Sequence, residues 1–188
     1  IGETEVTQEQ WEGVMGKNPS NFKGDKLPVE QVSWNTCQEF IKKLNDFGSA
    51  PEGYKFALPT EAQWEYACRA GSKTAYCFGD DDKQLGDYAW YSRNSGSKTH
   101  EVGTKKANAW GIYDMHGNVW EWCSDWYEDY PHSDVVDPTG ASSGADRVFR
   151  GSGWVLSAEG CRSAFRYFAT PGGSNDDLGL RLALVPSK

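Results

Sequence analysis

Residues 111–126, with the sequence GIYDMHGNVWEWCSDW, constrain the fold of this chain more than any other segment. In their second half, aromatic residues alternate with small or acidic ones at a period of two, which is typical of a strand. Trp120, Trp122 and Trp126 fall on one side of this strand, whereas Glu121 falls on the other. Three indole rings on one face are too much apolar surface to leave in water, so we expect the strand to cross the main core.

The other face of this strand carries carboxylates that need a partner. A buried carboxylate has to be paired, protonated or bound to a metal, because burying a lone charge is costly. Asp114, Gly117 and Asn118 form a tight polar turn just upstream, and Val119 points to the same side as Glu121. Carboxylate and backbone oxygens could therefore converge near Glu121, which is the ligand set of a hard cation. The alternative is that Glu121 accepts hydrogen bonds from backbone amides of the turn.

Length and charge limit the classes of protein that this chain can belong to. The 188 residues contain no Pro-, Ser- or Gly-rich tract separating two periodic halves, so we expect one domain over residues 1–188. The net charge of -8 argues against nucleic acid as a partner. No apolar run reaches the roughly 18 residues of a membrane span. The chain opens at Ile1 without a signal peptide, as if cut from a longer protein.

Helical periodicity is confined to the first part of the chain. Helices are predicted to begin near Thr7, at Ser33 and at Thr60, residues whose side chains can cap a helix. Beyond Gly71 the helical period disappears, and the sequence predicts turns and short strands. The expected strands are residues 88–91, 101–103, 119–122, 148–150, 161–168 and 180–185. Helices in the N-terminal half and short strands in the C-terminal half predict a loop-rich α+β fold.

The order of the motifs resembles the formylglycine-generating-enzyme (sulfatase-modifying factor) family. The matching segments are EVT at 5–7, PVEQVSW at 28–34, LPTEAQWEYA at 58–67, NAWG at 108–111, GNVWEW at 117–122, RV at 147–148, RG at 150–151, CRSA at 161–164 and Gly179. They span nearly the whole chain in the right order. The resemblance implies a C-type-lectin-like fold with little regular structure. It says less about activity, because a fold and its chemistry are separable.

The same resemblance implies which residues would hold the cation. Family members that bind calcium are similar to this chain at Asp114, Gly117, Val119 and Glu121. Two side chains and two backbone carbonyls would supply the oxygens there. We therefore expect calcium as the cofactor, with hydrogen bonding of Glu121 as the alternative.

The residues needed for the family's oxidative chemistry are missing from the sequence. Members that oxidise a substrate cysteine resemble one another in two nearby cysteines that bind copper, shortly after a Gly-Gly-Ser-Trp/Tyr stretch. The corresponding residues 151–160, GSGWVLSAEG, contain no cysteine, and Cys161 alone cannot form a copper bis-thiolate. His100, His116 and His132 belong to no catalytic motif. We expect no catalytic residue, no copper and no enzymatic activity.

Three function classes stay open: a ligand-binding surface protein, an accessory domain without catalysis, and an enzyme of the family whose site the motifs do not reveal. The C-terminus favours the first, because the chain resembles the variable proteins of diversity-generating retroelements. These carry a hypervariable C-terminal segment on this scaffold, which would be residues 147–185 here. The resemblance implies a cell-surface, outer-membrane lipoprotein anchored upstream of Ile1, whose partner is an unknown protein or another surface ligand.

Residues between Phe149 and Asp177 are predicted to form one exposed, diversified ligand-binding face. Adenine-directed mutagenesis of asparagine codons never yields Lys, Glu, Gln, Met or Trp, and no position between the framework residues has one of these types. The framework residues are Arg147, Val148, Arg150, Gly151, Trp154, Ala158, Glu159, Cys161, Arg162, Ser163, Ala164, Arg166, Thr170, Pro171 and Gly179. The predicted face comprises these free positions together with Trp154: Phe149, Ser152, Gly153, Trp154, Val155, Leu156, Ser157, Gly160, Phe165, Tyr167, Phe168, Ala169, Gly172, Gly173, Ser174, Asn175, Asp176 and Asp177. Rigid rings among adaptable polar residues are typical of a binding surface. The alternative is that the rings are core and residues 172–177 an ordinary solvated loop.

Overall fold

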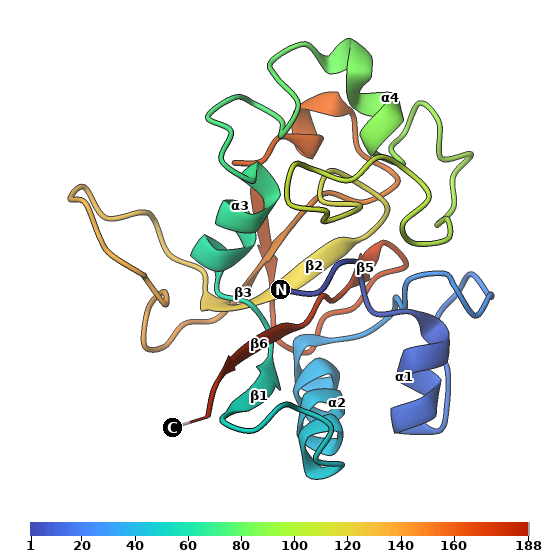
Figure 1. The fold of residues 1–188 in the computed structure, drawn as a ribbon, viewed down its shortest axis with the longest axis vertical. Helices are drawn as coiled ribbons and strands as arrows, with labels where there is room; N and C mark the ends of the chain where they lie inside the picture. The colour runs from blue at the N-terminus through green and yellow to red at the C-terminus, as the bar shows by residue number, and fades with distance from the viewer. Residues whose placement is uncertain (188) are drawn as a thin grey trace.

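The computed structural model describes residues 1–187, in which short elements are joined by long loops (Figure 1). The helical elements are α1 (Gln8–Met15), α2 (Trp34–Asp46), α3 (Glu61–Arg69), the 3-10 turn η1 (Asp82–Gln84), α4 (Leu85–Tyr88) and the 3-10 turn η2 (Ala158–Cys161). The strands are β1 (Tyr54–Ala57), β2 (Trp120–Trp126), β3 (Arg147–Arg150), β4 (Arg166–Ala169), β5 (Leu178–Gly179) and β6 (Ala183–Pro186). The architecture is the loop-rich α+β fold that the sequence predicts.

The three predicted helix starts are confirmed, and each has the same local cause. Thr7, Ser33 and Thr60 cap α1, α2 and α3, and each side chain accepts the backbone N–H three residues later. The side chain of that third residue bonds back to the backbone of the cap. Such a capping box satisfies two N–H groups that a helix otherwise leaves unpaired. Among residues 1–187, no helix combines the length and the apolar character needed to cross a membrane.

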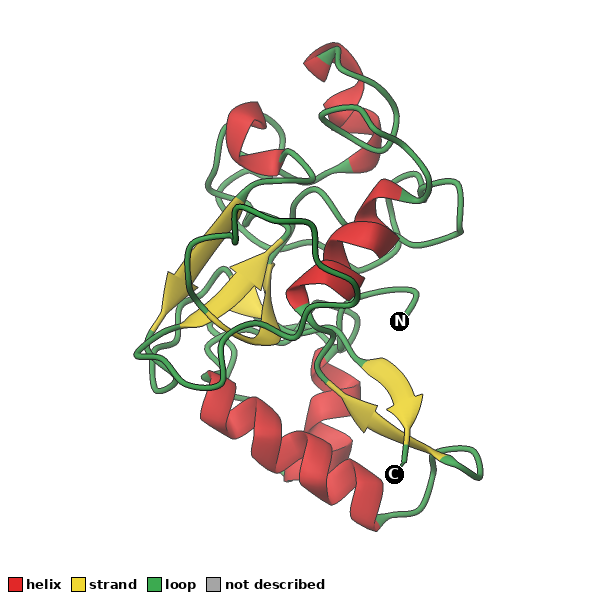
Figure 2. Cartoon of the chain, turned by 90° about the vertical axis from the view of Figure 1, so that its left-hand side faces the viewer, coloured by secondary structure: helices red, strands yellow, loops and turns green. Residues whose placement is uncertain are grey.

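A four-stranded sheet of order β4-β3-β2-β5 lies at the middle of the molecule. β2 pairs antiparallel with β3 and parallel with β5, and β4 pairs antiparallel with β3 at the edge. The α1–α2 pair lies at one end of this sheet and α4 at the other, while the small β1–β6 sheet stands apart (Figures 1 and 2). The predicted variable segment thus supplies β3, β4 and β5 of the central sheet.

The two faces of β2 pack into different parts of the core. Trp120 and Trp122 are buried in a cluster with Phe149 and with residues of α1 and α2. Cys123 points to the other side, into a cluster with Trp64 of α3. This division confirms the alternation along the strand. The third indole differs, because Trp126 is only half-buried. It follows a register shift in the β2–β3 pairing, which lies between Trp122 and Trp126.

Some predicted strands are wrong, and the reasons are local. Residues 85–88 form α4, and residues 89–91 are irregular, because the aromatic side chains there pack against loops instead of pairing in a sheet. Residues 101–103 form a turn. Residues 158–161 form η2, so the strand expected at 161–168 begins only at Arg166. β1 was not predicted, since its first two residues are exposed and it pairs only with β6.

Candidate ligand-binding groove

A groove of about 420 Å³ lies against the central sheet, at the β4 edge. Ten of its twelve lining residues belong to the predicted ligand-binding face, and the other two come from β2 and β5. The lining residues are Trp120, Phe149, Leu156, Phe165, Tyr167, Phe168, Ala169, Gly173, Ser174, Asn175, Asp177 and Leu178. Positions far apart in the variable segment are thus brought together at one concavity.

Aromatic rings form the floor and one wall of this groove. Trp120 and Phe149 are 5% and 6% exposed, and their rings meet edge to face with centroids 5.1 Å apart. Tyr167 lies opposite Phe149 in the β3–β4 pairing, with the ring centroids 5.7 Å apart. Tyr167 and the neighbouring Phe168 remain 54% and 37% exposed. The buried rings support the exposed ones, which leaves rigid apolar surface available to a ligand.

The opposite wall is polar and carries one titratable group. Ser174 and Asn175 are exposed, whereas Asp177 is buried and accepts a hydrogen bond of 2.8 Å from Asn175 Nδ2. Burial raises the pKa of Asp177 to about 6. A Cβ atom on Gly153 would lie 2.6 Å from the Asp177 carboxylate, so glycine makes room for it there. A carboxyl group that changes charge near neutral pH therefore lies beside apolar rings.

β4 is anchored from the side that faces away from the groove. Arg166 donates hydrogen bonds of 2.8 Å and 2.6 Å to the two carboxylate oxygens of Glu61 in α3. Its guanidinium lies between the rings of Tyr127 and Tyr130, 4.6 Å and 4.2 Å from their centroids. Arg162 does not anchor the face in this way, because its side chain is exposed and donates to the backbone carbonyl of Glu159. Arg166 thus fixes the strand that carries Tyr167.

The remaining eight positions of the predicted face do not line the groove. They are Ser152, Gly153, Trp154, Val155, Ser157, Gly160, Gly172 and Asp176. Ser152, Gly153 and Gly160 are buried. Trp154 is half-buried and donates from its indole nitrogen to the carbonyl of Asp176. Conversely, Trp120 lines the groove, although the sequence predicts it only as a core residue. The alternation shows which side of the strand a ring faces, but it does not show whether the edge of the ring reaches the surface.

The predicted cation residues lie together in a buried turn, where an arginine already pairs with Glu121. Arg181 donates to both carboxylate oxygens of Glu121, at 2.8 Å and 2.9 Å, and the indole nitrogen of Trp64 donates at 2.6 Å. Val119 is fully buried, and Gly117 is so close to a neighbouring carbonyl that a Cβ atom would lie 2.3 Å from it. Glu121 thus accepts hydrogen bonds, as the alternative to metal binding expects. The donors are the side chains of Arg181 and Trp64, however, and not the backbone amides of the turn.

Unpaired oxygens lie next to this turn. Asp114 Oδ2 accepts the backbone N–H of Gly103 at 2.7 Å, but Asp114 Oδ1 and both carboxylate oxygens of Glu5 are buried without a hydrogen bond. Burial, and then the Asp114 carboxylate, raise the pKa of Glu5 well above its ordinary value. Within residues 1–187, no group of three or more His, Cys, Asp or Glu side chains is arranged to hold a metal ion. Calcium at Asp114, Gly117, Val119 and Glu121 therefore stays a prediction.

The cysteines do not form a reactive pair in this structure. All five are free thiols, and only Cys77 is not buried. Cys161 lies beside the groove segment, where burial raises the pKa of its thiol to about 11. Its Sγ lies 3.4 Å from both Ser152 Oγ and the carbonyl of Ser157. A thiol held protonated in this way is a poor nucleophile and a poor metal ligand.

The chain is similar to known proteins over its whole length. The sulfatase-modifying factor enzyme 1-like domain family matches residues 1–185. The chaperone protein LppX of Paenibacillus barcinonensis is 33% identical over 97% of this chain and 78% of its own length. The formylglycine-generating enzyme of Streptomyces coelicolor is 35% identical over 83% of this chain, which spans 52% of that enzyme.

Solved structures agree with these similarities. The Treponema denticola variable protein 1, a variable protein of a diversity-generating retroelement, superposes with a TM-score of 0.93 at 38% identity, over 100% of this chain and 84% of that one. PvdO from Pseudomonas aeruginosa superposes with a TM-score of 0.82 at 24% identity, over 98% of this chain and 79% of that one, which supports the fold alone. The chain belongs to the family of sulfatase-modifying factor enzyme 1-like domains and has its C-type-lectin-like fold.

Proposed function

We propose that this protein is a non-catalytic ligand-binding protein whose segment 147–185 is diversified by a retroelement. The observation that carries the proposal is the groove, in which ten positions predicted to be free to vary converge. The similarity to the Treponema denticola variable protein 1 over the entire chain supports it. The framework arginine Arg166 is held by Glu61 outside the groove, so the lining can change without loss of this anchor.

The groove favours a protein, or another surface ligand with apolar groups, as the partner. Exposed Tyr167 and Phe168 offer rigid rings, and the polar wall of Ser174 and Asn175 offers adaptable hydrogen bonding. A volume of about 420 Å³ accommodates a few side chains of a larger partner. The net charge of -8 disfavours nucleic acid. Ligand identity would then depend on the residues present at the variable positions.

The absence of catalysis is part of the same proposal. Formylglycine-generating enzymes are among the relatives, so an enzyme or an accessory domain of this family is the competing function. Residues 151–160 contain no cysteine, and the Cys161 thiol is buried and protonated at neutral pH. A copper bis-thiolate needs two thiolates. We therefore propose that the protein uses no copper.

We further propose display at the cell surface through a lipid anchor upstream of Ile1. This rests on the resemblance to retroelement variable proteins. Protease treatment of intact cells that produce the complete gene product tests the location. Degradation of the protein on intact cells is expected, and full protection in intact but not in lysed cells would contradict surface display.

The ligand-binding role can be tested with a display library. Six groove positions (Leu156, Phe165, Tyr167, Phe168, Ser174 and Asn175) are randomised, and the library is selected against an unrelated protein such as lysozyme. A matched library randomises six exposed positions on α1, α2 and the following loop: Glu9, Glu12, Glu39, Lys42, Lys43 and Glu52.

The expected result is that folded, specific binders come from the groove library and not from the matched one. Binding should be lost when the selected groove residues are returned to those of the original chain. Equal yields from both libraries, or groove variants that no longer fold, would contradict the proposal.

A further inference from the structure

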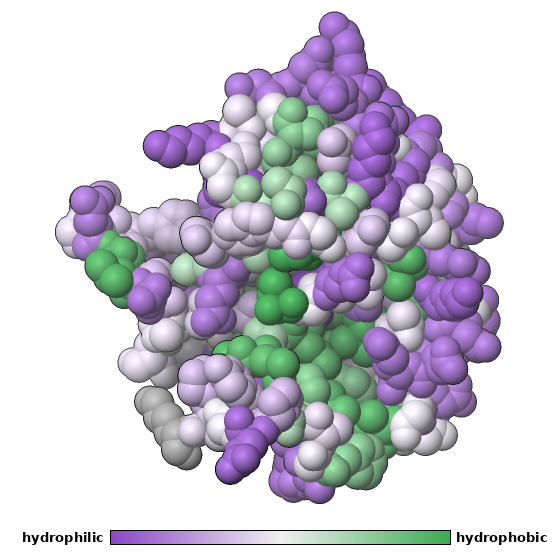
Figure 3. Space-filling model, in the orientation of Figure 1, coloured by the Kyte–Doolittle hydropathy of each residue, from purple (hydrophilic) through white to green (hydrophobic). Residues whose placement is uncertain are grey.

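A second pocket, which shares no lining residue with the groove, lies between α3 and the loop that joins β2 to β3. The loop, residues 127–146, stands off one side of the molecule, and a small apolar area flanked by hydrophilic residues lies on it (Figures 1 and 3). Its base is fixed by the Trp126–Ala141 bridge and by a hydrogen bond of 2.8 Å from the Tyr127 N–H to the Asp146 carbonyl. Loops of this length without secondary structure are uncommon inside compact domains.

Apolar groups form the walls of this pocket, whose volume is about 490 Å³. Tyr66 of α3 lies on one side, and Tyr130, Pro131, Val135 and Pro138 of the loop lie on the other. The Tyr130 hydroxyl donates to Glu61 Oε1 at 3.1 Å, which ties this part of the loop to α3. The size is within the usual range for sites that bind small molecules or single side chains.

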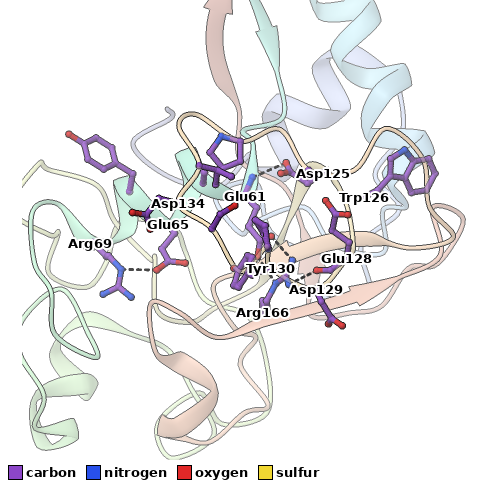
Figure 4. A pocket seen from close by; sticks show the side chains of 17 residues that line it. Glu61, Glu65, Arg69, Asp125, Trp126, Glu128, Asp129, Tyr130, Asp134 and Arg166 are labelled. Atoms are coloured by element: carbon purple, nitrogen blue, oxygen red, sulfur yellow. Dashed lines mark hydrogen bonds and ion pairs between the residues drawn. The ribbon is translucent and has the colours of Figure 1, made fainter.

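Negative charge exceeds positive charge around the pocket (Figure 4). Its charged residues are Glu61, Glu65, Asp125, Glu128, Asp129, Asp134, Arg69 and Arg166. The two arginines are already paired, Arg69 with Glu65 at 2.8 Å and Arg166 with Glu61 at 2.6 Å. The other four acids form no salt bridge with any residue in 1–187. The pocket therefore carries negative charge that is not balanced by the protein, and a positively charged ligand could balance it.

One carboxylate oxygen without a hydrogen-bond partner points to where that charge would bind. Asp125 lines the pocket and is only 4% exposed. Its Oδ2 accepts from the Glu61 N–H at 2.8 Å and from Ser124 Oγ at 3.1 Å, whereas Oδ1 accepts no hydrogen bond from residues 1–187. The loop passes over Oδ1 at Gly140, where a Cβ atom would lie 3.1 Å from it. Oδ1 is not fully buried, so it keeps acceptor capacity at the pocket, and a cationic donor would bond to it more strongly than a neutral one.

We propose that this pocket binds a guanidinium or ammonium group on an apolar stem, as in an arginine or lysine side chain. The charged end bonds to Asp125 Oδ1, Glu128, Asp129 and Asp134 surround it, and the stem lies between Tyr66 and the loop. An arginine or lysine has this combination of an apolar stem and a charged end. The site is separate from the diversified face, so it accepts this chemistry whatever the sequence of the variable segment.

The test is a titration of the whole chain, labelled with 15N, with N-acetyl-arginine methylamide followed by NMR. N-acetyl-lysine methylamide is the second probe, and the citrulline analogue is the neutral isostere of arginine. Shifts are expected at the indole of Trp126 and the amides of residues 125–140, with a Kd of about 1 mM. Citrulline should bind at least about tenfold more weakly, and about 0.15 M salt should weaken the arginine complex.

Two variants and a matched control localise the binding. Asp125→Asn keeps an acceptor for the Glu61 N–H, and Asp129→Asn/Asp134→Asn changes only exposed loop residues. Each should weaken arginine binding at least tenfold. Asp25→Asn/Glu52→Gln removes the same charge as the loop pair from exposed positions outside the pocket and should leave binding unchanged.

Three results would overturn the proposal. The first is the absence of NMR shifts on addition of the arginine or the lysine probe. The second is equal affinity for the arginine and citrulline probes. The third is an equal loss of arginine affinity in Asp129→Asn/Asp134→Asn and in the matched control. If Asp125→Asn does not fold, as judged by circular dichroism, the loop pair alone decides the outcome.

Discussion

Replacement of Glu61 by glutamine should destabilise the protein strongly, because two arginines of the central sheet depend on this one carboxylate. Glu61 Oε1 accepts from Arg150 Nη1 at 2.6 Å, Arg166 Nε at 2.8 Å and the Tyr130 hydroxyl at 3.1 Å. Oε2 accepts from Arg166 Nη2 at 2.6 Å. The Arg150 side chain is fully buried, and that of Glu61 is 8% exposed. Glutamine keeps one acceptor oxygen but turns an amide N–H₂ toward a guanidinium.

The magnitude follows from the bonds that are lost. A hydrogen bond to a charged group contributes about 1.5–3 kcal/mol. Arg166 bonds to both oxygens of Glu61, so it loses one of these bonds whichever oxygen the amide nitrogen replaces. Breaking a buried ion pair from one side costs about 3–5 kcal/mol. Arg150 keeps Glu65 and the Ser163 carbonyl as partners, so the lower part of this range, about 3 kcal/mol, is expected. For a chain of this size that corresponds to a fall in Tm of about 6–12 °C.

Urea denaturation followed by tryptophan fluorescence and by far-UV circular dichroism measures this loss. Agreement of the two signals supports a two-state analysis. Glu65→Gln is the matched control, because the Glu65 side chain is 25% exposed and one of its two partners is Arg69 on the same helix. Glu65→Gln should lower the free energy of unfolding by less than Glu61→Gln does. A loss below about 1 kcal/mol for Glu61→Gln, or equal losses in both variants, would refute the reasoning.

Three further predictions concern the buried acids and the missing chemistry. Because the pKa of Glu5 is raised in the folded protein, its contribution to stability is fully present below the unfolded value of about 4.5 and is lost as the pH rises through the folded value. The free energy of unfolding should therefore fall with rising pH above about 4.5. Glu5→Gln should make this dependence on pH less steep, and a variant with the same pH dependence as the original chain would contradict the assignment to Glu5. Calcium should raise Tm most at the high-pH end of this range, where Glu5 and Asp114 are both ionised, and a chelator should reverse the effect; a Tm indifferent to both excludes the calcium site. Incubation with copper and a sulfatase-motif peptide should give no aldehyde by mass spectrometry, and detection of formylglycine would show that catalysis does not need the two missing cysteines.

Much of the fold could be predicted because its determinants are local. Thr7, Ser33 and Thr60 each combine a capping side chain with a suitable third residue, and these signals need no tertiary context. The alternation in β2 places its residues on two sides correctly. The α4 helix and β1 were not predicted, because α4 is a single turn and β1 an exposed strand that depends on β6 at the far end of the chain.

The site was predictable only in part, since burial depends on contacts that the sequence does not show. Gly153 and Gly160 were placed on the ligand-binding face, but they lie against Asp177 and Leu156 and make room for those side chains. The partner of Glu121 is Arg181, which is sixty positions away and carries no motif that links the two. The pocket beneath the 127–146 loop was not predicted, because the loop residues that line it mix apolar and acidic types without a period and belong to no motif.

Sequencing the coding DNA of residues 147–185 in many independent isolates of the source organism tests the central claim most directly. If the groove is a diversified ligand-binding face, substitutions should concentrate at the free positions, including the ten that line the groove, and only in codons whose template copy contains adenine. The framework codons, among them Arg150, Arg166 and Gly179, should not change. Substitutions spread evenly over framework and groove positions, or an invariant segment in every isolate, would contradict the account.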